Sequence, residues 1–207
     1  MNIDPVGALV TLVILVFSAI VHEVSHGLMA EKLGDSTARD EGRITLNPIP
    51  HIDPFGSILL PGFLLLVGSP IVFGAAKPVP VNFHNLRPMK LGMALVSLAG
   101  PLSNFFLAVL LILPLVFGLI APGPVADIWL KAVVLNIVLG TFNLLPIPPL
   151  DGSKIVASAL PTNLMYWILS MERYGFFIVI IFLYLGLLDK ILLPVVVTFF
   201  RIFGVQI

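Results

Sequence analysis

The chain is a succession of long apolar segments separated by short polar stretches. The first apolar segment covers residues 6–29, which as a helix would cross the roughly 30 Å hydrocarbon core of a bilayer. The third and fourth segments cover residues 91–120 and 126–145 and have comparable lengths, although Gly100-Pro101 interrupts the third near its first third. This pattern predicts a membrane-spanning helix for each of the three segments.

The remaining segments are less regular. Residues 55–76 are apolar but contain glycines and prolines throughout, and irregular backbone is tolerated at membrane depth only where protein or a water-filled cavity covers it. Residues 77–83 alternate in character and predict a short extended stretch. Residues 153–171 are weakly apolar and broken by Pro161, whereas residues 174–203 form a last apolar segment, read as one span followed by an interfacial helix.

Composition agrees with a membrane location. Of the 207 residues, 58% are hydrophobic and 11% are charged, whereas a soluble domain carries about 25% charged residues. We therefore expect an all-α polytopic membrane protein with about four to five transmembrane helices and a partly embedded, glycine- and proline-rich segment with short extended stretches. It would form a single membrane-embedded domain over residues 1–207, with its core at about 6–155.

Charge and cysteine content exclude several classes of site. The formal net charge is zero, which gives no support to nucleic-acid binding. The chain has no cysteine, which excludes disulfides and thiolate metal sites. The N-terminus has no basic residues before the apolar run, so we interpret the first segment as a retained helix and not a cleaved signal peptide.

The motif with chemical content is His22-Glu23-Val24-Ser25-His26, a His-Glu-x-x-His pattern near the end of the first apolar segment. On a helix, His22 and His26 project from one face one turn apart, which suits two imidazoles on one metal ion. Glu23 projects beside them and can take a proton from a metal-activated water. Because ionisable groups inside a membrane are costly and usually functional, the pattern indicates a metal site.

A catalytic metal site, for zinc or another divalent first-row ion, usually has three protein ligands, and the strongest candidate for the third is Asp151. It follows the fourth apolar segment, and three prolines between residues 146 and 149 unwind the chain just before it. Such a break would let the carboxylate turn into the protein interior. An aspartate here could also cap a helix that starts at Gly152, and the two roles are compatible.

Sharing one metal ion constrains the topology, because His26 and Asp151 must then be separated by an even number of crossings. Three apolar segments intervene, and segment 55–76 is the best candidate for a re-entrant element. With that choice most basic residues share one side of the membrane, and Lys131 lies on the other. By the positive-inside rule, the side that carries most of the basic residues is cytoplasmic. The residues on that side are Lys32, Arg39, Arg43, Lys77, Arg87, Lys90, Lys154 and Arg173.

Three ordered motifs resemble the site-2 protease family of intramembrane zinc metalloproteases. They are His-Glu-x-x-His at residues 22–26, Ala-Gly-Pro-Leu-Ser-Asn at residues 99–104, and Asn-x-x-Pro-x-x-Pro-Leu-Asp-Gly at residues 143–152. Residues 43–48 and 76–82 are similar to the compact prokaryotic branch, in which no peptide-binding module is inserted.

The resemblance implies one zinc ion per chain, bound by His22, His26 and Asp151, with Glu23 activating water. It implies that Asn143 holds the substrate backbone or stabilises the oxyanion. The expected reaction is hydrolysis of a peptide bond within or next to a transmembrane segment of another membrane protein. The enzyme would sit in the lipid bilayer of a prokaryotic plasma membrane, with its active site towards the cytoplasmic side.

Other interpretations of these residues remain open. Asn143 could simply hydrogen-bond across helices, as buried polar residues in membranes do, and Asn104 is expected to serve packing and hydrogen bonding. His51 and His84 are expected to be solvated loop residues, although His51 could reach the mouth of the active site. Two rival functions use the same polar cluster: a transporter or channel, and a non-catalytic homologue that binds membrane helices. The sequence does not define an oligomeric state.

Overall fold

The computed structural model describes residues 5–53, 59 and 77–205, and within these ranges the regular secondary structure is helical, without strands. The longer helices are α1 (Pro5–Lys32), α4 (Met89–Val116), α5 (Pro124–Asn143), α6 (Asp151–Ala159), α7 (Thr162–Ser170), α8 (Gly175–Tyr184) and α9 (Leu187–Ile202). Single turns are formed by α2 (Thr37–Asp40), η1 (Ile49–His51), η3 (Phe83–Asn85) and η4 (Met171–Tyr174).

Four stretches in the described part of the chain are long and apolar enough to cross a membrane: Leu9–Lys32, Met89–Val116, Pro124–Asn143 and Thr162–Phe182. They carry exposed large apolar side chains such as Leu12 and Phe106, which a lipid bilayer would remove from water. The predicted all-α, multi-pass architecture is confirmed. The last candidate span differs from the prediction, because it runs through α7 and η4 into α8 and does not begin at residue 174.

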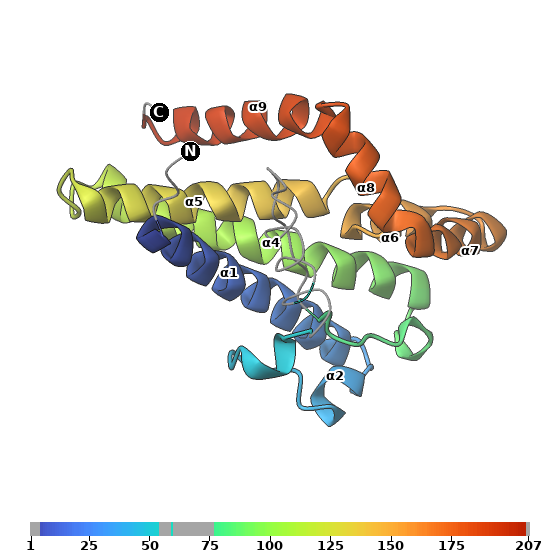
Figure 1. Cartoon of the computed structure of the whole chain (residues 1–207). Helices are drawn as coiled ribbons and strands as arrows, with labels where there is room; N and C mark the ends of the chain where they lie inside the picture. The colour runs from blue at the N-terminus through green and yellow to red at the C-terminus, as the bar shows by residue number, and fades with distance from the viewer. Residues whose placement is uncertain (1–4, 54–58, 60–76, 206–207) are drawn as a thin grey trace.

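The core of the molecule is a bundle of α1, α4 and α5 in which α4 runs antiparallel to the other two (Figure 1). Helix α4 continues through Gly100-Pro101 without a break, so the predicted interruption is wrong. Proline is tolerated within membrane helices because neighbouring helices and hydroxyl side chains satisfy the freed backbone groups.

The predicted re-entrant element, residues 55–76, lies almost entirely outside the described residues. Its described flanks meet, since the Lys77 N–H donates to the His51 carbonyl at 2.9 Å. Farther along, the Arg87 N–H donates to the Leu33 carbonyl at 3.1 Å. Helix α4 therefore starts at the end of the bundle where α1 finishes. Helices α4 and α5 then run along the bundle in opposite directions, which returns the chain to that end at the start of α6 (Figure 1).

The C-terminal segment is divided at Gly186, whose φ of 62° lies in the left-handed region that glycine adopts without strain. After this break α9 packs lengthwise along α5 (Figure 1). Its residues Val196 and Phe200, one turn apart, are buried with Ile112 of α4 and Ile137 of α5. The arrangement differs from the predicted interfacial helix because this apolar face of α9 is covered by the bundle.

Candidate metal centre

The structure brings together two histidines of α1 and the first residue of α6. The Nε2 atoms of His22 and His26 lie 3.0 Å apart, and each lies 3.1 Å from Oδ2 of Asp151. All three residues are buried. Three ligands bonded to zinc at 2.0–2.1 Å in a tetrahedral arrangement would lie about 3.3 Å from one another. The triangle of atoms thus has nearly the dimensions of one face of a zinc coordination tetrahedron.

Hydrogen bonds at the other ring nitrogens leave the Nε2 lone pairs free. Nδ1 of His26 lies 2.7 Å from the Val96 carbonyl, which can only accept, so this nitrogen carries the proton. Nδ1 of His22 lies 2.7 Å from Oδ1 of Asn104 and donates in the same way. In the neutral imidazoles, two nitrogen lone pairs and a carboxylate oxygen therefore converge within 3.1 Å. A cation between these three acceptors removes their mutual repulsion.

The Asn104 side chain is held so that its oxygen faces His22. Its Nδ2 atom donates to the Ser18 carbonyl at 3.2 Å and to Oδ1 of Asn136 at 3.1 Å. Asn136 in turn donates to the Ala132 carbonyl at 2.9 Å. The hydrogen-bonding role expected of Asn104 is confirmed. Asn136 was missed by the sequence analysis, although a buried amide in an apolar helix could have revealed it.

Gly100 of α4 makes room for the two imidazoles. A Cβ atom at this position would lie 2.4 Å from Nε2 of His26 and 2.6 Å from Nε2 of His22, closer than non-bonded atoms can approach. The Gly-Pro motif thus lets α4 pass directly beside the histidine pair. The donor set, the proton positions on the rings and this space all fit a zinc ion.

Asp151 is the first residue of α6, and the N-cap position before it is occupied by Leu150. The capping alternative is therefore wrong, because its carboxylate turns towards the imidazoles. Its second oxygen, Oδ1, lies 3.7 Å from the Lys154 ammonium, which in turn lies 4.0 Å from Glu172. The carboxylate thus contacts the histidines through one oxygen and a cation through the other.

Glu23 is half-buried and adjacent to the histidine pair. Its Oε2 atom accepts a hydrogen bond of 2.7 Å from the Val79 backbone N–H. Val79 belongs to the predicted extended stretch 77–83, which forms no strand: residues 77–82 are irregular, with extended backbone at Asn82, and Phe83 already belongs to η3. This contact joins the motif of α1 to a segment more than fifty residues later in the chain.

Asn143 ends α5, and its side-chain nitrogen donates to the Leu139 carbonyl of the same helix at 3.0 Å. This bond differs from the cross-helix bond considered above, and the predicted role towards substrate stays a prediction. His84 is exposed, as expected. His51 is buried, with Nε2 2.9 Å from the Thr45 carbonyl, so its interpretation as a solvated residue is wrong.

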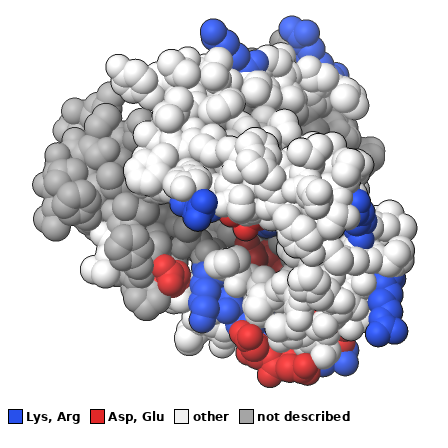
Figure 2. Space-filling view, turned by 90° about the vertical axis from the view of Figure 1, so that its right-hand side faces the viewer, with Lys and Arg blue, Asp and Glu red and all other residues white. Residues whose placement is uncertain are grey.

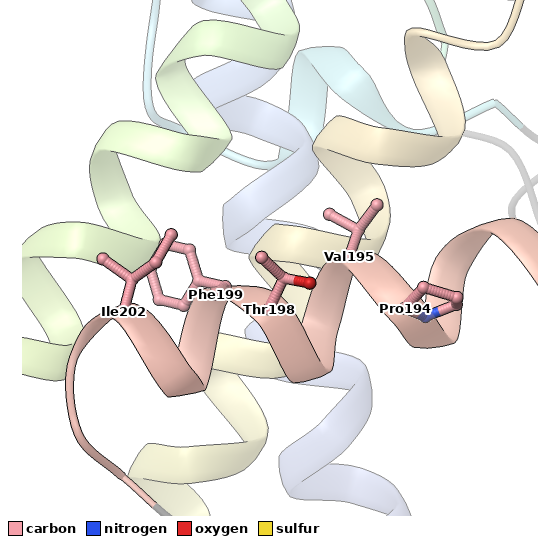
Figure 3. A pocket seen from close by; sticks show the side chains of 5 residues that line it. All are labelled: Pro194, Val195, Thr198, Phe199 and Ile202. Atoms are coloured by element: carbon pink, nitrogen blue, oxygen red, sulfur yellow. The ribbon is translucent and has the colours of Figure 1, made fainter.

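Two hollows lie on the surface of the molecule. Figure 2 shows the end of the molecule that carries α6 and α7, where basic and acidic side chains gather and acidic atoms are visible inside a hollow. A second hollow of about 300 Å³ lies on α9 and is lined by Pro194, Val195, Thr198, Phe199 and Ile202 (Figure 3). Since it contains no titratable group, it is not a candidate catalytic site.

Comparison with known proteins gives one family match. The profile of peptidase family M50 matches residues 118–186, which include Asn143 and Asp151. The protein named "Putative zinc metalloprotease YwhC" of Bacillus subtilis is 39% identical over 191 residues, covering 87% of this chain and 82% of its own length. No solved structure matches this chain.

Two further relatives come from distant prokaryotes. "Putative zinc metalloprotease Rip2" of Mycolicibacterium smegmatis is 31% identical over 91% of this chain and 72% of its own length. "Putative zinc metalloprotease MJ0611" of Methanocaldococcus jannaschii is 34% identical over 79% of this chain and 75% of its own length. The alignments with YwhC and Rip2 thus extend over most of both chains.

Proposed function

The chain belongs to peptidase family M50, that of the site-2 proteases, and from this premise we propose that it hydrolyses a peptide bond within or next to a transmembrane segment of a membrane-protein substrate. It is an intramembrane zinc metalloprotease by family and by the names of its relatives. The observation that carries the proposal is the cluster of His22, His26 and Asp151, buried among helices apolar enough to span a membrane.

In this proposal His22, His26 and Asp151 hold the zinc ion, with the fourth position open to water and substrate. Zinc bound there supplies Lewis acidity, which activates water at neutral pH and polarises the scissile carbonyl. The protein fixes the orientation of the ligands: Asn104 and the Val96 carbonyl keep the Nδ1 protons in place. Such partners orient metal ligands and raise their basicity.

Glu23 is the general acid–base. Its carboxylate projects from the turn that carries the histidines, and one of its oxygens is held by the Val79 N–H, which leaves the other available to the attacking water. It would accept the proton of that water and then deliver it to the leaving amine. Asn143, at the end of α5 and eight positions before Asp151, is assigned to the substrate backbone or the oxyanion.

We assign the active site to the cytoplasmic side of a prokaryotic plasma membrane. The basic residues Arg39, Arg87 and Lys154 belong to the end of the bundle near Leu33 and α6, whereas Lys131 follows the turn at the other end. This distribution supports the positive-inside orientation. The hollow at the end of the molecule shown in Figure 2 supports entry of water from that side. The whole chain would act as one membrane domain.

Glu23→Gln tests the function. In detergent or lipid, the purified variant should keep its zinc and lose cleavage of a model transmembrane substrate by at least ~100-fold. Glu41→Gln, the same change at an exposed glutamate, should cleave like the wild type. Zinc binding by the wild type without cleavage would favour the transporter or the helix-binding homologue. A wild type without zinc, or cleavage by Glu23→Gln, would refute the protease mechanism.

A further inference from the structure

Residues 77–82, here called the strap, lie against α1 at the level of Glu23. Backbone N–H groups at both ends of the strap donate hydrogen bonds: the Lys77 N–H to the His51 carbonyl at 2.9 Å, and the Asn82 N–H to the side-chain Oδ2 of Asp35 at 2.7 Å. Between these ends it contacts one acidic and one basic side chain. The acidic one is Glu23, and the basic one is Arg43.

A single peptide group links these two side chains. The Pro78 carbonyl accepts a hydrogen bond of 3.1 Å from Nη2 of Arg43, and the N–H of the same peptide, on Val79, donates to Oε2 of Glu23 at 2.7 Å. The same guanidinium nitrogen also donates to the Lys77 carbonyl at 2.8 Å. The peptide dipole therefore lies between a cation at its carbonyl end and a carboxylate at its N–H end, the orientation that both charges favour.

Arg43 is an unusual residue for a purely structural contact. Its exposed fraction is 4%, and among the described residues it has carbonyl partners but no ion pair. Burying a guanidinium without a counter-ion costs free energy. A neutral side chain could donate hydrogen bonds to the two carbonyls at a lower free-energy cost. In a medium of low dielectric constant, a cation at the carbonyl strengthens the N–H donor at the other end of the peptide.

The strap has little freedom to carry the Val79 N–H elsewhere. Pro78 and Pro80, on either side of Val79, fix φ at about −65°. On its other side Val79 packs tightly against α1: a Cβ added to Gly27, one turn after Glu23, would lie 3.1 Å from Cγ1 of Val79. Moving the Val79 N–H away from Glu23 thus requires the strap to move at the Pro78 carbonyl, to which Arg43 donates a hydrogen bond.

We propose that Arg43 is a positioning residue for peptide hydrolysis, acting on Glu23 through the Pro78–Val79 peptide. The guanidinium holds this peptide so that its N–H fixes one Glu23 oxygen and leaves the other directed at the attacking water. Arg43 contacts neither the metal ligands nor Glu23 itself. This inference rests on the proposed function, since it requires Glu23 to be the general base.

Arg43→Gln and Arg43→Lys, compared in the full-length protein, test the role. Arg39→Gln and Arg39→Lys are matched controls, because Arg39 lies four residues away but is 68% exposed and pairs with Glu31. The measurements are zinc content, thermal stability, and kcat and KM for a model transmembrane substrate. A small misplacement of a catalytic group lowers turnover by up to about 100-fold. We expect Arg43→Gln to lose about 10- to 100-fold in kcat at unchanged KM and zinc content.

Arg43→Lys should recover part of kcat, because it keeps the charge and a donor, and both Arg39 variants should match the wild type. Unchanged kcat in Arg43→Gln, or an effect confined to KM, would overturn the proposal. Should Arg43→Gln fail to fold, Arg43→Lys decides: kcat about threefold or more below that of Arg39→Lys supports the role, and equal kcat overturns it. Because Glu23→Gln tests the protease activity separately, failure of this inference leaves that result intact.

Discussion

Nδ1 of His22 lies 2.7 Å from Oδ1 of Asn104, and this hydrogen bond determines which nitrogen of the ring is free for a metal. The amide is oriented because its nitrogen donates to Ser18 and Asn136. With its oxygen facing His22, the ring carries its proton on Nδ1 and directs the Nε2 lone pair at His26 and Asp151. Asn104 therefore orients the His22 ring, although it is not itself one of the three clustered residues His22, His26 and Asp151.

Replacing Asn104 with leucine should weaken zinc binding by about 10- to 100-fold, the usual effect of removing a group that orients a metal ligand. The His22 ring would lose its acceptor and could carry its proton on either nitrogen. Competition with a chromogenic chelator measures the dissociation constant. Asn104→Asp keeps an oxygen acceptor and should retain more affinity than Asn104→Leu. Equal affinities in Asn104→Leu and the wild type would show that the hydrogen bond has no such role.

Gly100→Ala should abolish stoichiometric zinc binding and cleavage. The added methyl group would lie 2.4 Å from Nε2 of His26 and 2.6 Å from Nε2 of His22, so either the imidazoles or helix α4 must move. Zinc content of the purified protein measures this directly.

Gly92→Ala is the matched control for Gly100→Ala. It makes the same change on the same helix, but its Cβ would meet Leu86 at 2.8 Å and no metal ligand. It should lower stability and keep its zinc. If Gly100→Ala bound one zinc per chain with wild-type affinity, the close approach of α4 to the histidines would have no functional meaning.

The meeting of His22, His26 and Asp151 could be predicted from sequence because it depends on local geometry and on a topological rule. Helical periodicity places His22 and His26 on one face, and the requirement for an even number of crossings brings Asp151 to their end of the bundle. The partners of these residues could not be predicted in the same way. Which carbonyl accepts from His26, and which N–H reaches Glu23, depend on how α4 and the strap pack against α1.

Two wrong predictions have the same origin. His51 lies in a polar loop and was expected to be solvated, yet it is buried, with its ring bonded to the Thr45 carbonyl and its own carbonyl bonded to the Lys77 N–H. Gly100-Pro101 was expected to interrupt its helix, yet α4 continues through both residues while packed against α1 and α5, and packed membrane helices tolerate an internal proline. In both cases tertiary packing overrides the local preference of the sequence.

Asp35 should make the stability of the protein depend on pH at the acidic end. Burial raises the pKa of its carboxyl, but hydrogen bonds from the Thr37 hydroxyl, the Asn85 amide and the backbone N–H groups of Asn82 and Thr37 lower it more, so the net pKa is below the usual value. The carboxylate form is therefore favoured by folding. Its contribution is fully present above the unfolded-state pKa of about 3.9 and is lost as the pH falls through the lower folded-state value.

Asp35→Asn removes this contribution at neutral pH. Hydrogen bonds to charged groups contribute about 1.5–3 kcal/mol each, so we expect a lower thermal midpoint in detergent at pH 7 and a smaller difference from the wild type near pH 3. Asp40→Asn, at an exposed aspartate bonded to Ser36, is the control. A constant difference between Asp35→Asn and the wild type from pH 7 to 3 would contradict the assignment.

The topology can be tested with single cysteines, because the chain contains none of its own. Arg39→Cys and Arg87→Cys place a thiol at exposed positions near the end of α1 and before α4, and the Arg87 N–H bond to Leu33 fixes these segments at one end of the bundle. Leu119→Cys lies in the exposed turn after α4. A membrane-impermeant maleimide should label the first two from one side of the membrane and Leu119→Cys from the other.

Labelling of Arg39→Cys and Arg87→Cys from opposite sides would refute the even number of crossings, and with it the shared metal site of His26 and Asp151. If both positions are labelled from the same side, comparing intact cells with inverted vesicles shows whether that side is the cytoplasmic one. The positive-inside rule predicts that both arginine positions react only in inverted vesicles. Water would then reach Glu23 from the cytoplasm, and a substrate would be cut near the cytoplasmic end of its transmembrane helix.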